Sequence, residues 1–368
     1  MTQTRQFSVV MGSSTANGTS RSLLGRFAPD RWTHKHTMVL LFGGVLPLLF
    51  VICLGLGRFW VPPVEVVRIL IAESGLMSLE PTWNDQMRTV VMSIRLPRLI
   101  ASLLIGGALA IAGATFQGIF RNPLVSPDLL GISNGAAVGA SIAILMRLPA
   151  LTIQFSALAM GLVTVFITTR IPRLFRQNSP LMLVLAGVIM SGFMAALLGV
   201  AKFVADPEDE LGQIVFWTLG SVATVKLSDV ALVVIPMLIA IVVLVMLRWR
   251  VTLLSLGDAE ARSLGVNVTR VRGVMIICAT ITTAGAVSLA GTISWVGLII
   301  PHLARLIVGE ENRFLVPLSL ILGAEFMLVV DTLARTLTGS EIPLSIITGV
   351  LGAPLFLLLL GRQRAHLR

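Results

Sequence analysis

The side chains best suited to polar chemistry lie in one segment, residues 248–272, between two apolar stretches. Its sequence, RWRVTLLSLGDAEARSLGVNVTRVR, predicts two short helical turns that break at Gly257 and Gly265, because glycine suits sharp backbone turns. Good helix formers surround a charged cluster between those glycines, made of Asp258, Glu260 and Arg262. In a chain that is only 12% charged, this segment indicates a surface that faces water and docks against a partner.

The sequence does not indicate an enzyme. Its three lysines, Lys35, Lys202 and Lys226, do not follow glycine, so the phosphate-binding loop GxxxxGK[ST] does not occur. Paired carboxylates and nucleophile patterns are also missing, and Cys53 and Cys278 lack the CxxC or His spacing of metal sites. We therefore expect no catalytic residue, no cofactor and no bound metal. If the protein performs work that needs ATP hydrolysis, a partner must hydrolyse the ATP.

Apolar helices must position these residues. The chain is 55% hydrophobic with a mean hydropathy of +0.92, and apolar runs recur at the length that crosses roughly 30 Å of hydrocarbon as a helix. The sequence predicts an all-α, polytopic membrane protein of about ten spans. The third and eighth are interrupted by Gly, Ser or Pro and should be the least regular. We place the spans at residues 37–59, 96–116, 129–148, 151–169, 181–203, 230–247, 274–289, 293–307, 314–337 and 343–360.

Charge orients the predicted bundle. Most of the Lys and Arg behind the net charge of +10 fall in the tails and in the loops after even-numbered spans, which places both termini in the cytoplasm. We divide the chain into a disordered cytoplasmic tail (1–36), a single transmembrane domain (37–362) and a short cytoplasmic tail (363–368). The basic residues are spread over loops, so a nucleic-acid partner is not expected.

Small residues show two patterns. A stripe at Gly106, Ala110 and Ala114 in span two predicts close packing against a neighbouring helix. A faint internal repeat links spans two and seven, which are five apart and therefore run in opposite directions, as in inverted-repeat transporters, although small residues also match by chance. The repeat matches Gly107 with Gly285, Gly113 with Gly291 and Pro123 with Pro301.

Four longer motifs follow one another over roughly residues 40–362. They are RLPRLIASLLIGGALAIAGATFQGIFRNPLVSPDLLGISNGAAVGA, LGDAEARSLGVNV, GTISWVGLIIPHLARLIVG and EIPLSIITGVLGAPLFLLLL. Together they closely resemble the FecCD family, the permease subunits of ABC importers for ferric siderophores, haem and cobalamin. The resemblance implies ten spans and a second permease subunit, either identical or a paralogue. It also implies a periplasmic or lipid-anchored binding protein and two cytoplasmic ATPase subunits, in the inner membrane of a bacterium or archaeon.

The resemblance assigns a docking role to three arginines. Arg95 and Arg98 of the RLPR motif, with Arg335, match arginines that contact acidic residues of the binding protein, and forked guanidinium groups suit carboxylates. We expect Arg95 and Arg98 to be reachable at the outer end of span two. Contact with lipid headgroups, or an internal pair of Asp331 with Arg335, is the alternative.

Three further segments are matched to the family in the same way. Residues 213–221 resemble a short helix before span six, and Asn178 with Ser179 matches the cytoplasmic gate, although small polar residues there are also common N-caps. The polar segment matches the part of the family that sits in a cleft of each ATPase subunit, with an ordinary solvated loop as the alternative. Its coupling residues are Gly257, Asp258, Ala259, Glu260, Ala261, Arg262, Ser263, Leu264 and Gly265.

Two polar residues lie inside predicted spans. Glu325 departs from the family pattern, and we expect a protonated or hydrogen-bonded structural residue rather than a cargo contact. His302 is predicted to pack and form hydrogen bonds rather than to bind a metal.

These observations predict a permease subunit that moves a ferric siderophore or similar iron chelate by alternating access. Haem, cobalamin or a molybdate-like oxyanion are alternative cargoes within the family. An ion-coupled secondary transporter is the alternative from another class, because an inverted repeat alone would allow it. Such a transporter would work without an ATPase and a binding protein.

Overall fold

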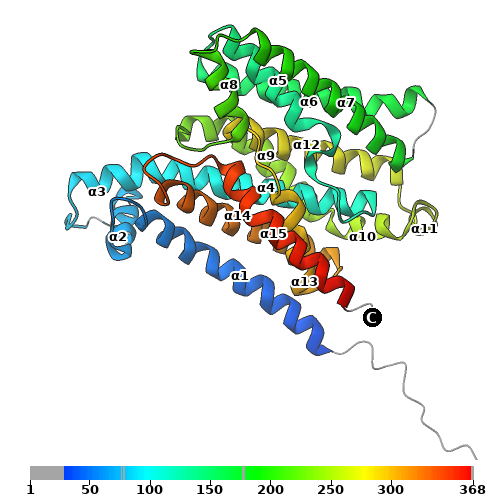
Figure 1. Cartoon of the computed structure of the whole chain (residues 1–368). Coiled ribbons are helices and arrows are strands. Elements are labelled where there is room, and N and C mark those ends of the chain that lie inside the picture. The colour runs from blue at the N-terminus through cyan, green and yellow to red at the C-terminus, as the bar shows by residue number, and fades with distance from the viewer. Residues whose placement is uncertain (1–28, 76, 78, 176–178, 366–368) are drawn as a thin grey trace, which may run out of the picture.

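The computed structural model describes residues 29–75, 77, 79–175 and 179–365, and this part of the chain is helical and contains no strand (Figure 1). Seven of its helices are long and apolar enough to cross a membrane, and three shorter apolar helices accompany them. Each of the ten predicted spans falls on one of these helices. The prediction of an all-α, polytopic membrane protein is confirmed.

The third and eighth predicted spans are α5 and α13, which have only 14 and 13 residues, as their Gly, Ser and Pro content indicated. A π-helical turn (Val90–Arg95) joins α3 to α4, and a 3-10 turn (Pro127–Leu130) precedes α5. The helices are α1 (Pro29–Gly55), α2 (Pro63–Glu73), α3 (Asp85–Thr89), α4 (Leu96–Phe120), α5 (Ile132–Leu145), α6 (Ala150–Leu174), α7 (Pro180–Val204), α8 (Glu210–Leu219), α9 (Leu227–Met246), α10 (Arg248–Leu256), α11 (Asp258–Ser263), α12 (Val268–Ala290), α13 (Val296–Val308), α14 (Asn312–Thr336) and α15 (Leu344–Ala365).

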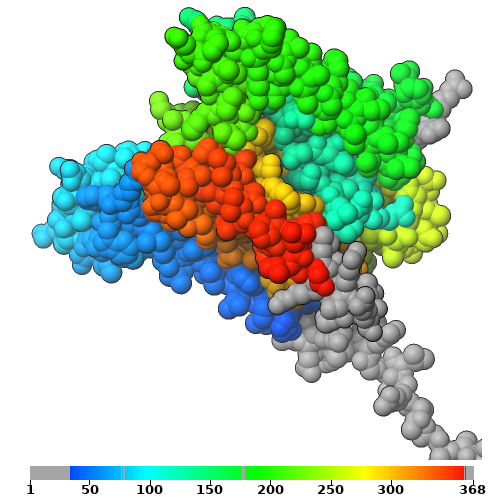
Figure 2. Space-filling model, in the orientation of Figure 1, coloured from blue at the N-terminus to red at the C-terminus, as the bar shows by residue number. Residues whose placement is uncertain are grey.

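Helix α4 is the centre of the bundle. In the continuous helical segment Asp85–Phe120, 89% of the most apolar window is buried, against 17% for α1. It packs against α14, α12, α13 and α9, so nearly every face of it must be apolar. Figure 2 shows the contrasting periphery, where α15 (red) and α7 (green) form part of the surface.

Glycines bring α4 into backbone contact with two neighbours. A Cβ at Gly106 would overlap the carbonyl oxygen of Gly323 in α14, and a Cβ at Gly113 would overlap the carbonyl oxygen of Gly297 in α13. Ala110 lies beside Gly323 as well, so the predicted stripe of small residues does mediate close helix packing.

A buried amide supports the second of these crossings. Pro301 has no N–H, so the carbonyl of Gly297, four residues earlier in α13, loses its helical partner. Gln117 of α4 donates through Nε2 to this carbonyl at 3.4 Å, and its Oε1 accepts a hydrogen bond from Arg305 at 2.7 Å. The proline in α13 and the glutamine in α4 therefore form one structural unit.

We name the two ends of the bundle after Arg98, in the first turn of α4, and Asp258, which lies near the other end of this helix. The Arg98 end is where α4 begins, and the Asp258 end is where it finishes at Arg121, whose guanidinium lies 3.9 Å from Asp258. Helix α12 starts near Asp258 and therefore runs opposite to α4. A short helix follows each of them: α5 follows α4, and α13 follows α12. These directions agree with the predicted inverted repeat. The described chain begins and ends toward the Asp258 end, as an even number of spans requires (Figure 1).

Substituting alanine for glycine should have opposite effects at two helical positions. Gly106→Ala forces α4 away from Gly323, which we expect to cost about 1–3 kcal/mol through overpacking. Gly44→Ala in α1 meets nothing within 4 Å and should stabilise its helix by about 0.5–1 kcal/mol. Thermal unfolding of the purified variants in detergent measures both. Equal melting temperatures for the two would contradict the proposed contact.

Candidate functional site

At the Arg98 end, one buried carboxylate holds two arginines. Asp331 of α14 is fully buried and accepts hydrogen bonds from Arg98 Nε at 2.5 Å and from Arg335 Nε at 3.3 Å. Arg98 also donates through Nη1 to Glu341, a partly exposed residue in the loop before α15. Two carboxylates thus balance two guanidinium groups and join α4, α14 and this loop. The internal Asp331–Arg335 pair considered from the sequence is present.

The same arginines also close the end of α1. This helix ends at Gly55, so its last carbonyl groups have no partner within the helix, and its negative end attracts cations. Arg95 and Arg335 supply the missing donors. Arg95 donates to the carbonyl oxygens of Leu54 (2.7 Å), Gly55 (3.0 Å) and Phe59 (2.6 Å), and Arg335 donates to those of Cys53 and Leu56.

The expectation that Arg95 and Arg98 are reachable from outside is wrong. Only 5% of Arg95 and 4% of Arg98 is exposed, because Asp331 and the end of α1 take up their donors. The exposed arginine beside them is Arg58, in the turn after α1, which donates to the carbonyl of Thr338 in the facing loop. We missed Arg58 in the sequence. The sequence feature that could have identified it is a positive charge at the end of span one that is farther from the basic N-terminal tail.

The polar segment at the Asp258 end folds as predicted, into two short helices with breaks at both glycines. Gly257 separates α10 from α11 and has φ +136°, and Gly265, two residues after the end of α11, has φ +78°. Both values lie in the region that favours glycine, so the sharp turns depend on these two residues.

Asp258, the first residue of α11, connects this segment to two long helices. Its carboxylate accepts hydrogen bonds from Arg272 of α12 at 2.6 and 3.2 Å, and Arg121 at the end of α4 lies at 3.9 Å. The hydrogen bonds from Arg272 hold the pKa of Asp258 below its usual value. The ion pair therefore persists at neutral pH and is lost only as the pH falls through that lowered pKa.

The remaining side chains of α11 point in two directions. Ala261 is fully buried and belongs to the main apolar core, whereas Glu260, Arg262 and Ser263 are exposed. Leu264 is 59% exposed, and Leu256, at the end of α10, is 57% exposed. Sequence reasoning selected Leu264 and missed Leu256, which lies across the glycine turn. Two exposed leucines around a fixed short helix form a surface suited to an apolar pocket.

The predicted gate is only partly described. Asn178 lies outside the described residues. Ser179 precedes α7, and its Oγ accepts a hydrogen bond from the backbone N–H of Met182 at 3.2 Å, which is N-cap geometry. Ser179 also lines a cavity between α6, α7 and α12.

The two polar residues inside spans lack side-chain partners in the described structure. Glu325 is 8% exposed, and its Oε1 accepts no hydrogen bond there. His302 is buried, and its ring centroid lies 5.8 Å from that of Phe356 in an edge-to-face arrangement, so it packs as expected. Neither ring nitrogen has a hydrogen-bond partner among the described groups. The predicted short helix before span six is present as α8.

Comparison with known proteins identifies the fold. The model of the FecCD transport family matches residues 45–362. The molybdate import system permease protein MolB of Haemophilus influenzae is 39% identical over 319 residues, which are 86% of this chain and 94% of MolB. A probable iron chelatin transport system permease protein of Helicobacter pylori is 42% identical over 284 residues, 75% of this chain and 83% of that protein.

A solved structure agrees with these matches. An ABC transporter described as metal-chelate type, in an inward-facing conformation, superposes with a TM-score of 0.79 at 36% identity and covers 89% of this chain and 99% of its own. The sequence motifs, the ten apolar helices and the comparisons lead to one assignment: the chain belongs to the FecCD transport family and is a multi-pass membrane permease of the ABC importer type.

Proposed function

We propose that this permease carries a ferric siderophore or a similar iron chelate from a binding protein into the cytoplasm by alternating access. The observation that carries the proposal is the link through α4. This helix starts beside the Asp331 network and finishes at Arg121, beside Asp258. Partners at the two ends would therefore act on one rigid, buried helix, which is what coupling between distant sites requires.

ATP hydrolysis belongs to two separate ATPase subunits in this proposal. Each holds the segment Gly257–Gly265 of one permease subunit in a cleft on the cytoplasmic side. Leu256 and Leu264 supply apolar anchors, because they are the large exposed apolar side chains around α11. Asp258 passes the movement of α11 to α12 through Arg272.

The binding protein docks at the Arg98 end. Arg58 provides an exposed charge, while Arg95, Arg98 and Arg335 fix the end of α1 and the turn that carries Arg58. The four arginines outnumber the two carboxylates that pair with them, Asp331 and Glu341, so this cluster offers net positive charge to an acidic partner. The buried arginines thus serve docking by positioning the surface, rather than by contact.

The permease works as a pair in a bacterial or archaeal inner membrane, with both termini in the cytoplasm. Helix α7 exposes large apolar side chains, including Leu185, Ile189 and Phe193, which lipid or the second permease subunit would cover. Asn178 and Ser179, just before α7, form the cytoplasmic gate of the path between the two subunits.

The iron chelate is favoured by the Helicobacter pylori relative, and a molybdate-like oxyanion is the second candidate because MolB matches over 94% of its length. Haem and cobalamin are named for further relatives. An uptake assay in liposomes that contain purified permease, ATPase and binding protein distinguishes these cargoes. ATP-dependent accumulation of ferric siderophore supports the proposal. Accumulation of molybdate without accumulation of ferric siderophore would make molybdate the cargo instead. Uptake by the permease alone under an ion gradient would contradict the ATPase requirement.

Asp258→Asn should separate ATP hydrolysis from transport. The variant keeps the shape of the side chain but loses the charge that holds Arg272. We expect uptake in the liposome assay to fall roughly tenfold while the ATPase still assembles, since coupling between sites is typically ~1–3 kcal/mol. Hydrolysis and uptake that fall in parallel would contradict a coupling role for this ion pair.

Leu264→Asp should weaken ATPase assembly and eliminate transport, because it places a charge where an apolar anchor is needed. Glu260 is an exposed neighbour in α11, and the control variant Glu260→Ala should only reduce transport. Copurification measures assembly, and binding of the loaded binding protein, which should be unchanged, confirms folding. A stoichiometric, transport-competent complex with Leu264→Asp would disprove the anchor.

Arg58→Glu should slow association of the loaded binding protein by about tenfold at low salt, and the effect should shrink as salt increases, because exposed interface charges act mainly on the association rate. Arg68→Glu, an equally drastic change at an exposed arginine of α2, is the control. Surface plasmon resonance on the purified permease gives both rates. Identical association rates for the two variants would remove Arg58 from the docking surface.

A further inference from the structure

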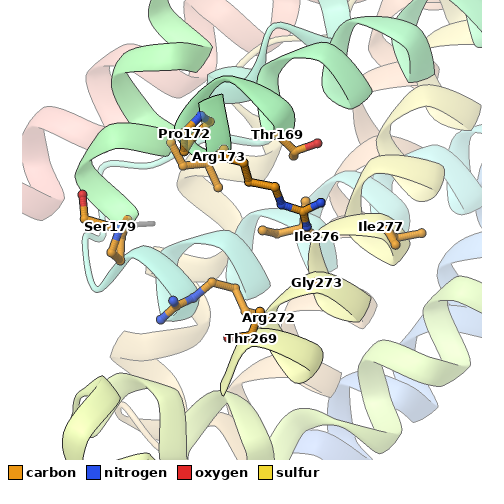
Figure 3. Close-up of a pocket in the computed structure, with 11 residues that line it drawn as sticks. Thr169, Pro172, Arg173, Ser179, Thr269, Arg272, Gly273, Ile276 and Ile277 are labelled. Carbon is orange, nitrogen blue, oxygen red and sulfur yellow. The ribbon is translucent and has the colours of Figure 1, made fainter. Parts of the chain in front are cut away.

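A basic cavity lies beside the start of α7, on the side of the bundle that carries Asp258. It has a volume of about 220 Å³ and lies between α6, α7 and α12 (Figure 3). Its polar lining consists of Thr169 and Arg173 from α6, Ser179 just before α7, and Thr269 and Arg272 from α12. None of the described residues that line it is acidic. The cavity therefore gathers two arginines and three hydroxyl groups without a carboxylate in its wall.

The two arginines come from opposite walls. Figure 3 shows Arg173 reaching from the last turn of α6 toward Ile276 of α12, while Arg272 extends from α12 itself. Arg272 uses both terminal nitrogens on Asp258, but its Nε is buried and has no partner among the described groups. Because this Nε is closed off from solvent, Arg173, which is exposed, supplies the guanidinium donors that an anion in the cavity could reach, and Arg272 contributes charge.

Two helix starts add to the positive character of the cavity. Helix α7 begins immediately after Ser179, and Thr269 lies in the first turn of α12. Both are long helices, and the N-terminal ends of long helices favour negative charge. Arg173, by contrast, lies in the last turn of α6, so its charge comes from the side chain alone. The two helix N-termini therefore add to the attraction that the arginines exert on an anion.

We propose that this cavity binds a small oxyanion. Several acceptor oxygens on one compact centre would match the two guanidinium groups, which pair well with phosphate-like and carboxylate groups. A volume of about 220 Å³ admits such an ion with some of its hydration water, since one water takes ~30 Å³. The free ion and the phosphate of a lipid headgroup share this chemistry, and the experiment below distinguishes them.

The site would also reach the coupling segment. Arg272 is common to the cavity wall and to the ion pair with Asp258, so an anion that draws on Arg272 competes with Asp258. An occupied cavity then loosens the start of α11. This consequence rests on the proposed coupling role of α11, whereas anion binding itself does not and can be measured on the permease alone.

The test uses the full-length permease in nanodiscs of zwitterionic lipid, at constant ionic strength set with chloride. Binding of molybdate and of inorganic phosphate is followed by calorimetry and by the shift in melting temperature. We expect saturable binding that Arg173→Gln weakens about tenfold. The control is Arg170→Gln, one helical turn earlier in α6, whose guanidinium lies 4.5 Å from the ring of Phe166 and which does not line the cavity.

Nanodiscs with added anionic phospholipid identify the source of the anion. Loss of oxyanion binding to the wild type in these discs assigns the site to a lipid phosphate, and unchanged binding assigns it to the free ion. Two results would overturn the proposal. One is the absence of saturable binding of either anion above chloride in the zwitterionic discs. The other is an equal effect of Arg170→Gln and Arg173→Gln, with the melting temperatures of the anion-free variants confirming that both fold.

Discussion

Helix α4 can occupy the centre of this bundle because glycine lets its backbone touch two neighbours. Gly106 meets Gly323 of α14, and Gly113 meets Gly297 of α13, where any side chain would overlap a carbonyl oxygen. In a membrane, burial of apolar side chains drives helix association only weakly, so close packing of this kind contributes much of the affinity between helices. The position of α4 in turn sets where Arg98 and Arg121 lie, and therefore where both polar ends of the protein are built.

The Arg98 end illustrates how charges are accommodated in such a bundle. Buried arginines without partners would be costly near hydrocarbon, and here every one of them is compensated. Asp331 serves Arg98 and Arg335, and the unpaired carbonyls at the end of α1 serve Arg95. The network consequently fixes the relative positions of α1, α4 and α14. It also leaves little of these guanidinium groups for a partner, so an acidic surface would meet the exposed turn above them.

The polar segment at the Asp258 end is held by one carboxylate that two arginines share. Arg272 holds Asp258 through two hydrogen bonds, and Arg121 adds a more distant charge. Because this carboxylate is only partly buried, its ion pair stays open to competition from the solvent side. The basic cavity on the other side of Arg272 offers such competition from an anion. A short helix held at one charged point can be displaced by its partners, whereas the backbone contacts of α4 cannot easily adjust.

The ten spans could be predicted from the sequence, because each must be apolar over the thickness of a bilayer. The breaks at Gly257 and Gly265 could be predicted as well, because only glycine readily adopts those conformations. The family could be identified because its motifs are continuous in the chain. The role of the arginines, by contrast, follows only from the packed bundle. Arg98 finds Asp331 at a distance of 233 residues in the sequence, and Arg95 finds carbonyls of α1 that any sequence would supply. Exposure depends on such partners, which are brought together only when α1, α4 and α14 pack, so no local pattern around RLPR could show that these side chains turn inward.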